Sequence, residues 1–190
     1  GEVIYQADLK ISSENQKLEE GKLVFTISGY KDLAGNTGRD ITQDDAKNSL
    51  VYDVTAPEIT LNGETKITLQ AGIDNYEEKY ATVTDNYDTT IENLKPEYIN
   101  YSVNGKFVSK VDSIDNKKLG TYKIVYKYID SCGNVGVDAS NRTHNYVIRT
   151  VEVVDTTKPV ITVKDSNKYR MEVGTEYVEK GYSVVDNYDG

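Results

Sequence analysis

Hydrophobic and polar residues alternate at every second position in several segments of this chain. In the segment 121–129, Tyr122, Ile124 and Tyr126 lie on one face, and Lys123 and Lys127 lie on the other. The segment 146–154 alternates in the same way, with valine at 147, 151 and 153 and arginine at 149 on one face. A two-residue period with β-branched and aromatic residues is typical of a half-buried β-strand. Shorter segments of this character are 23–27, 59–61, 66–70, 80–84 and 98–103.

The chain has no sustained 3.6-residue period, so we predict an all-β fold. Two polar stretches, 12–20 and 42–48, have the composition of a helical turn, and the second begins with a Thr42-x-x-Asp45 capping box. About seven short strands in each hundred residues, separated by turn residues, describe an antiparallel β-sandwich.

Three motifs recur in one order at nearly one spacing. They read D-x-x-G-N-x-G, V-x-D-x-T-x-P-x-I and D-N-Y-D. The matching segments are 32–38 with 130–136, 51–59 with 153–161, and 85–88 with 186–189, at offsets of 98, 102 and 101 residues. Three collinear matches indicate an internal repeat rather than chance.

The repeat divides the chain into parts of a tandem array. Residues 1–54 hold the C-terminal half of one unit, residues 55–156 a complete unit, and residues 157–190 the N-terminal part of a further, truncated unit. The chain is therefore predicted to be a window cut from a longer series. A third of a sandwich cannot bury its own apolar face, so we expect 157–190 to be poorly stable unless neighbouring sequence completes it.

The D-x-x-G-N frame, the V-x-V-x-D-x-T-x-P-x-I junction and the Gly120-Thr121-Tyr122 start of a strand resemble tandem bacterial immunoglobulin-like domains. Such domains occur in cell-surface proteins of Gram-positive bacteria and as modules of secreted enzymes and pesticidal crystal proteins. The resemblance covers 55–156 and parts of both flanks. It implies tandem immunoglobulin-like β-sandwiches and an extracellular location, either at the cell surface or secreted. It also implies a tyrosine corner at Tyr122, with an ordinary core tyrosine as the alternative.

Charge and residue counts narrow the function. Lys plus Arg is 22 and Asp plus Glu is 31, giving a formal charge of −9, so a nucleic acid is not an expected partner. No apolar run approaches 18 residues, so membrane insertion is not expected either. The single cysteine, Cys132, and the single histidine, His144, are twelve residues apart, and no H-E-x-x-H, G-x-S-x-G or phosphate loop occurs. We therefore predict that the chain is not an enzyme.

Acidic and amide residues gather in the predicted loops at one end of the complete unit. In an immunoglobulin-like sandwich the point where the chain enters, the B–C loop and the F–G loop lie at the same end. The residues concerned are Asp53, Asp85, Asn86, Asp88, Asp130 and Asn134. Oxygen ligands of this kind suit a structural Ca²⁺ ion in an extracellular module. The alternative is that Asp and Asn only shape the turns, by accepting hydrogen bonds from their own main chain.

The leading interpretation is a non-catalytic spacer or stalk repeat that projects a distal functional domain, with the neighbouring immunoglobulin-like repeats as its partners. The alternative is an adhesin or carbohydrate-binding module with a cell-surface glycan or protein ligand. Its support is a set of tyrosines that could present their rings to a ligand, namely Tyr76, Tyr80, Tyr87, Tyr98 and Tyr101. The absence of tryptophan counts against a sugar platform.

Overall fold

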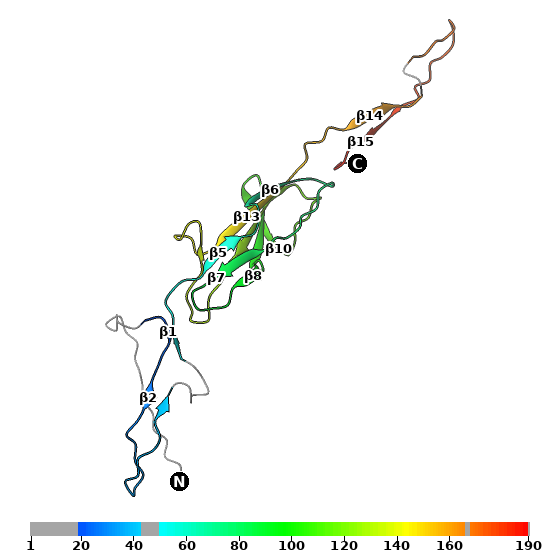
Figure 1. Cartoon of the computed structure of the whole chain (residues 1–190). Coiled ribbons are helices and arrows are strands. Elements are labelled where there is room, and N and C mark those ends of the chain that lie inside the picture. The colour runs from blue at the N-terminus through cyan, green and yellow to red at the C-terminus, as the bar shows by residue number, and fades with distance from the viewer. Residues whose placement is uncertain (1–18, 43–49, 166–167, 190) are drawn as a thin grey trace.

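The computed structural model describes residues 19–42, 50–165 and 168–189 (Figure 1). Within these ranges every regular element is a strand, so the predicted all-β class is confirmed, and no helix there is long and apolar enough to cross a bilayer. The two stretches with a helical-turn composition, 12–20 and 42–48, lie almost wholly outside the described residues. The strands are β1 (Gly21–Lys22), β2 (Thr26–Ile27), β3 (Ile41–Thr42), β4 (Val51–Tyr52), β5 (Glu58–Leu61), β6 (Lys66–Gln70), β7 (Ala81–Thr84), β8 (Ile91–Leu94), β9 (Tyr98–Val103), β10 (Lys106–Val111), β11 (Gly120–Tyr126), β12 (Val137–Asp138), β13 (Val147–Val154), β14 (Val160–Val163) and β15 (Tyr182–Val185).

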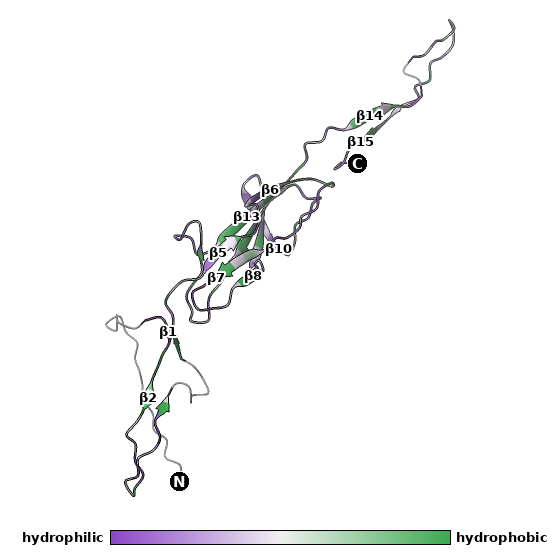
Figure 2. Cartoon of the chain, in the orientation of Figure 1, coloured by the Kyte–Doolittle hydropathy of each residue, from purple (hydrophilic) through white to green (hydrophobic). Residues whose placement is uncertain are grey.

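The middle of the chain forms two sheets that pack face to face. One sheet has the strand order β10-β9-β11-β13-β6, and the other has the order β12-β5-β7-β8. The core takes side chains from both, such as Ile59 and Val83 from the smaller sheet and Leu69, Ile124 and Val151 from the larger one. This central part is therefore a β-sandwich, and its strands contain most of the hydrophobic residues in this region (Figure 2).

The strand faces that the alternating patterns predict to be buried do face the core. In β13 the residues at 147, 149, 151 and 153 are buried, and those between them are half-buried. In β11 Tyr122, Ile124 and Tyr126 belong to the core, whereas Lys123 is exposed, as is Lys127 just after the strand. The alternation thus predicted both the strand and its buried face, as expected for a two-residue period.

Tyr122 forms the predicted contact with the main chain just before its strand. Its hydroxyl donates to the carbonyl oxygens of Asp115 (3.1 Å) and Lys118 (3.3 Å). The ring is buried and packs on Tyr101, with ring centroids 4.8 Å apart. Burial raises the pKa of Tyr122 to about 12, so the hydroxyl remains a donor at neutral pH.

The prediction of a purely antiparallel sandwich is wrong, because two of the strand pairs are parallel. β13 pairs with β6 in parallel, and β12 pairs with β5 in parallel, whereas all other described pairs are antiparallel. The β13-β6 pair arises at the short segment 62–65, where the chain leaves the smaller sheet after β5 and enters the larger sheet as β6. β6 therefore lies at the edge of the larger sheet beside β13, whereas β5 lies between β12 and β7 in the smaller sheet.

The flanking parts contain only two-stranded sheets, β1-β4, β2-β3 and β14-β15. Figure 1 shows the three parts one after another along a single axis. β14 and β15 pair in the register of β5 and β7: Ile59 faces Val83, and Ile161 faces Val184, at the repeat offsets of 102 and 101. The repeated sequence thus forms the same ladder in both places.

The D-x-x-G-N hairpin also recurs. Asp32 N donates to Asn36 O (3.0 Å), and Asp130 N donates to Asn134 O (3.1 Å). In both copies the asparagine amide donates to Oδ2 of the aspartate, at 2.7 Å in the first copy and 2.8 Å in the second. Because these bonds are local, the same residues fold the same turn in each copy.

Candidate metal centre at one end of the sandwich

Three acidic side chains from distant parts of the sequence meet at one end of the sandwich. Asp53 lies in the linker before β5, Asp85 follows β7, and Asp130 lies in the hairpin after β11. One carboxylate oxygen of each lies within 4.8 Å of those of the other two. Asp53 and Asp130 are only 7% and 6% exposed, and Asp85 is half-buried. Three carboxylates this close repel one another where water screens them poorly, unless a cation or a proton compensates them.

Asp130 is held as an anion by the hairpin that it shapes. Its Oδ1 accepts from the main-chain amides of Cys132 (2.9 Å) and Asn134 (2.8 Å), and its Oδ2 accepts from the Asn134 side chain. Burial acts to raise the pKa of Asp130, but these hydrogen bonds outweigh it and hold the pKa below its usual value. The carboxyl group therefore carries its charge at neutral pH.

Asp85 has one satisfied oxygen and one without a partner. Its Oδ1 accepts from the amides of Tyr87 and Asp88, both at 2.9 Å, which shapes the turn. Its Oδ2 is buried and has no hydrogen-bond partner among the residues that the structure describes. A buried carboxylate oxygen without a donor is costly. This atom is the feature of the cluster that turn formation leaves unexplained.

Asn134 connects two of the acidic residues. Its side-chain amide donates to Asp130 Oδ2 (2.8 Å) and to the main-chain oxygen of Asp53 (3.1 Å). Asp53 in turn accepts from Thr55 N through its Oδ1 (3.0 Å). The hairpin and the incoming linker are therefore fixed to one another beside the acidic cluster.

The remaining two predicted ligands have other partners. Both oxygens of Asp88 accept from Ser131, one from its amide and one from its hydroxyl, each at 2.8 Å. The side chain of Asn86 donates to Glu20 Oε2 (2.7 Å). The structure thus brings Asp53, Asp85 and Asp130 together, while Asp88 joins the two loops and Asn86 reaches the preceding part of the chain.

Glu20 connects the preceding part of the chain to the linker and to the loop after β7, a role that the sequence did not reveal. Its carboxylate accepts from Val54 N (3.1 Å), from the hydroxyl of Thr55 (2.9 and 2.7 Å to its two oxygens) and from Asn86. It lies 34 residues or more from each of these partners in sequence, so no local pattern connects them. A charged residue just before a strand carries no signal of such a contact.

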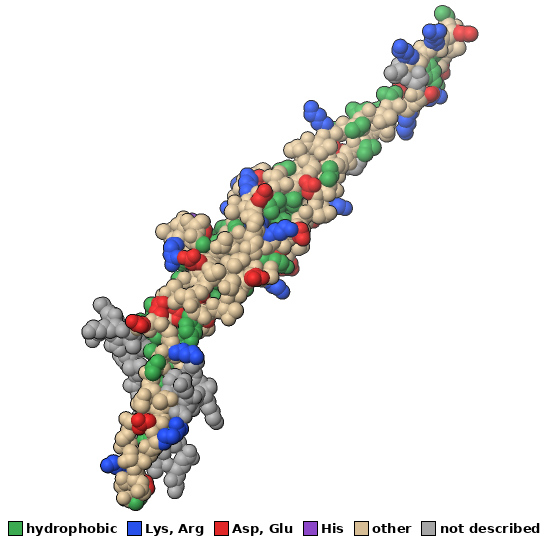
Figure 3. All heavy atoms as spheres, viewed as in Figure 1, with side chains coloured by type: hydrophobic (Ala, Val, Ile, Leu, Met, Phe, Trp, Pro, Cys, Tyr) green, Lys and Arg blue, Asp and Glu red, His purple; other side chains and the backbone are tan. Residues whose placement is uncertain are grey.

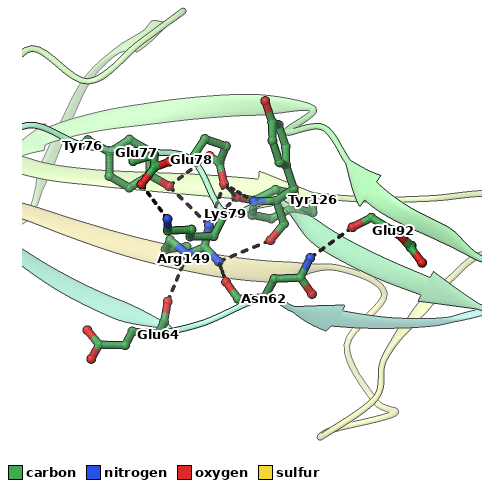
Figure 4. Close-up of polar contacts among 10 residues, drawn as sticks. Asn62, Glu64, Tyr76, Glu77, Glu78, Lys79, Glu92, Tyr126 and Arg149 are labelled. Carbon is green, nitrogen blue, oxygen red and sulfur yellow. Dashed lines mark hydrogen bonds and ion pairs between the residues drawn. The ribbon is translucent and has the colours of Figure 1, made fainter.

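A second polar cluster lies inside the sandwich, around Arg149 (Figure 4). Arg149 is 0% exposed, and its guanidinium is 2.6 Å from Glu78 Oε1. Its donors reach the carbonyl oxygens of Asn62 (2.5 Å), Glu64 (3.0 Å) and Tyr80 (3.3 Å), the Glu78 carboxylate, and the hydroxyls of Tyr76 (3.3 Å) and Tyr126 (3.1 Å). A buried charge must be satisfied in this way, and the network ties β13 to the crossover segment and to the loop before β7.

The tyrosines of this network keep their protons. Burial raises the pKa of Tyr126, and burial likewise raises the pKa of Tyr76 to about 12. Both hydroxyls donate to Glu78, from Tyr126 at 2.6 Å and from Tyr76 at 3.0 Å. The signal available in the sequence was an arginine on the otherwise apolar face of a strand, which requires a buried acidic partner.

Comparisons of this chain with protein-family models, with curated proteins and with solved structures found no match.

Proposed function

We propose that this chain is a non-catalytic spacer in a bacterial cell-surface or secreted protein, where it projects a distal functional domain. Its units are tandem immunoglobulin-like β-sandwiches, with boundaries near residues 54 and 156. One observation carries the proposal: the same local structures recur end to end, in the register shared by β5-β7 and β14-β15. What repeats is the framework of strands and turns, as expected if length is the selected property.

The paths into and out of the central sandwich fit this function. The linker from Asp53 to Pro57 reaches it beside Asp130, whereas β13 ends at Val154, beside the end of β6. Linkers of five residues, 53–57 and 155–159, separate the strands of successive units. Each added unit therefore extends the chain rather than folding back on it.

The sheet topology also suits a chain under tension. Along the chain, β6 is the first strand of the larger sheet and β13 is the last. The two pair in parallel over five residues, from Lys66 with Thr150 to Gln70 with Val154. Pulling on the two ends draws these strands past one another, which loads their hydrogen bonds together rather than one at a time.

The tyrosines considered for ligand binding do not share one surface. Tyr101 lies in the core and Tyr76 belongs to the buried arginine network. Tyr98 lies on the opposite face of its sheet, beneath the Lys110 ammonium at 4.3 Å. This distribution favours a spacer over an adhesin or carbohydrate-binding module.

Small-angle scattering tests the spacer directly. A chain carrying a second copy of residues 55–156 should be longer by one unit, roughly 40 Å for the eight residues of β13 and the five of a linker at ~3.3 Å each. A much smaller increase in maximum dimension would show that the units pack side by side, contrary to a stalk. A glycan array with the same protein addresses the alternative, because saturable and selective binding there would favour the adhesin.

We further propose that the acidic cluster binds a structural Ca²⁺ ion. The specific support is Asp85 Oδ2, a buried carboxylate oxygen that lies in a cluster with two more carboxylates and has no donor in the described part of the chain. Ca²⁺ takes six to eight oxygen ligands and accepts carboxylates, main-chain carbonyls and water in flexible geometry. The cluster supplies three carboxylates from three separate loops, so an ion there would join the linker to both loops.

Thermal unfolding with Ca²⁺ and with a chelator tests this site. For a dissociation constant of roughly 10⁻⁴–10⁻³ M, about 10 mM Ca²⁺ stabilises the folded state by about 1.4–2.7 kcal/mol. That corresponds to a rise in Tm of roughly 5–15 °C for a domain of this size. Asp85→Asn should remove the Ca²⁺-dependent rise, whereas the surface control Asp112→Asn should retain it. An identical Tm in Ca²⁺ and in chelator would leave turn formation as the whole role of these residues.

A further inference from the structure

We propose that the D-N-Y-D turn is a docking element, and that the side-chain amide of its asparagine binds each unit to the end of the unit before it. The inference rests on the proposed spacer function and gives that function a defined partner surface. The turn occurs at 85–88, after β7, and at 186–189, after β15.

The two copies of the turn have the same internal hydrogen bonds. Oδ1 of Asp85 accepts from residues 87 and 88, both at 2.9 Å. Oδ1 of Asp186 accepts from residues 188 and 189, at 2.8 and 3.1 Å. The first aspartate therefore fixes the turn, which leaves the amide of the next residue free to bond elsewhere.

Both asparagines use that amide to reach the preceding part of the chain. Asn86 Nδ2 donates to Glu20 Oε2 at 2.7 Å, and Asn187 Nδ2 donates to the main-chain oxygen of Ala71 at 2.8 Å. The acceptors lie 66 and 116 residues away in sequence. The same donor thus makes the same kind of contact at two successive junctions, although the acceptors belong to different segments.

The receiving surfaces are equivalent ends of two units. Glu20 directly precedes β1, which pairs with β4, the last strand before the first linker. Ala71 directly follows β6, and its amide donates to the oxygen of Val154, the last residue before the second linker. Each asparagine therefore contacts the end from which the preceding unit releases the chain.

The second junction brings two main chains into direct contact. A Cβ atom on Gly72 would lie 2.6 Å from the main-chain oxygen of Asn187, so only glycine fits there. Beside this contact the side chain of Gln70 accepts from the Thr156 hydroxyl (2.8 Å) and donates to Asp155 Oδ1 (3.1 Å). The linker and the turn are therefore both held against the same end of the central sandwich.

The chemistry of the partner surface follows from these contacts. An amide donor selects an end that presents an oxygen acceptor, either a carboxylate or a carbonyl. An aspartate in place of the asparagine has the same shape but places an acceptor against an acceptor, and at the first junction a charge against a charge. Docking should therefore fail in Asn86→Asp without a change in the turn itself.

Distance measurements between two spin labels in the 190-residue chain test the docking at the first junction. The labels are introduced as Leu33→Cys and Val108→Cys, which are 110% and 53% exposed, in a Cys132→Ala background that copies the alanine at position 34. The unsubstituted junction should give one narrow distance peak, and Asn86→Asp should lose it. The matched control is Asn104→Asp, the same change in the β9-β10 turn, which should keep the peak.

A second arm tests the other junction with labels at Val108→Cys and Val173→Cys. Gly72→Ala should lose the narrow peak, whereas Gly63→Ala, which also has a positive φ but has its nearest neighbour at 3.8 Å, should keep it. A broad distribution in the unsubstituted chain, or equal peaks in Asn86→Asp and Asn104→Asp, would overturn the docking. Neither result bears on the scattering test above, because a flexible series of units can still act as a spacer.

Discussion

The strand pairs β5-β7 and β14-β15 share one register but differ in burial. Ile59 and Val83 are 0% and 2% exposed, whereas Ile161 and Val184, at the same repeat positions, are 66% and 42% exposed. The prolines at one repeat position differ in the same way, since Pro57 is buried and Pro159 is exposed. Among the described residues β14 and β15 form a sheet of their own, whereas the larger sheet covers β5 and β7. Local sequence is thus sufficient for the ladder, but burial needs the opposite sheet; Figure 3 shows the resulting hydrophobic surface over β14 and β15.

The loops before β7 and β15 likewise share a local contact between polar residues but differ in what surrounds it. Tyr76 donates to Glu78 at 3.0 Å, and Tyr177 donates to Glu179 at 2.6 Å. In the central unit Glu78 also binds the buried Arg149. The tyrosine–glutamate contact therefore forms without the arginine, and the arginine converts it into a buried link between the two sheets.

Removal of that arginine should have the largest effect. Arg149→Ala leaves Glu78 without its cationic partner inside the sandwich, and we expect a loss of about 3–5 kcal/mol in unfolding free energy. Arg142 also pairs with a glutamate, Glu58, but on the surface, so the control Arg142→Ala should cost at most about 1 kcal/mol. Urea unfolding of both variants measures the difference. Equal losses would mean that the buried network adds no stability beyond that of a surface pair.

The next largest effect on stability is expected at the two isoleucines in equivalent repeat positions, Ile59 and Ile161. Ile59→Ala should cost about 2–4 kcal/mol, because it leaves a cavity in a closed core. Ile161→Ala should change the stability of the same chain by less than about 0.5 kcal/mol, because the side chain is already exposed. Urea unfolding with tyrosine fluorescence checks both. A comparable loss in Ile161→Ala would show that β14 and β15 are covered in solution.

These effects also indicate what the sequence could predict. The segments 66–70 and 98–103 were predicted with the observed bounds of β6 and β9, because their alternation reports a buried face directly. β10 was missed because it is an edge strand with a bulge between Phe107 and Ser109, which disrupts the alternation. The Asn104-Gly105 turn before it was the available signal.

The acidic cluster shows the same division between local and distant information. Repetition of the loops indicated which residues to consider, and the structure brings three of the six together. Glu20 and the partners of Asn86 and Asp88 could not be predicted, because each contact depends on how distant loops meet. Short sequence motifs determine the local turns, whereas the contacts between loops depend on the assembled sandwich.

High pH should destabilise the central unit through its buried tyrosines. Burial raises the pKa of Tyr122 to about 12, against about 10 in an unfolded chain. The folded state thus holds this proton more tightly, so the stabilisation is complete below about pH 10 and is lost as the pH rises toward 12. The Tm should fall across this window. Tyr122→Phe should cost about 1 kcal/mol at neutral pH and make the fall shallower; an unchanged slope would exclude Tyr122 as a contributor.

The smallest expected effect concerns Tyr80, a strained residue at the end of the loop before β7. Tyr80 has a positive φ of 61°, and the repeat places Gly181 at its position with a φ of 81°. Tyr80→Gly should relieve about 1 kcal/mol of backbone strain, and the greater freedom of glycine in the unfolded chain should cost about 0.5–1 kcal/mol. The two nearly cancel, so we expect a net change within about 0.5 kcal/mol by urea unfolding. A loss above about 1.5 kcal/mol would mean that the half-buried tyrosine ring stabilises the central unit in a way that has no counterpart at Gly181.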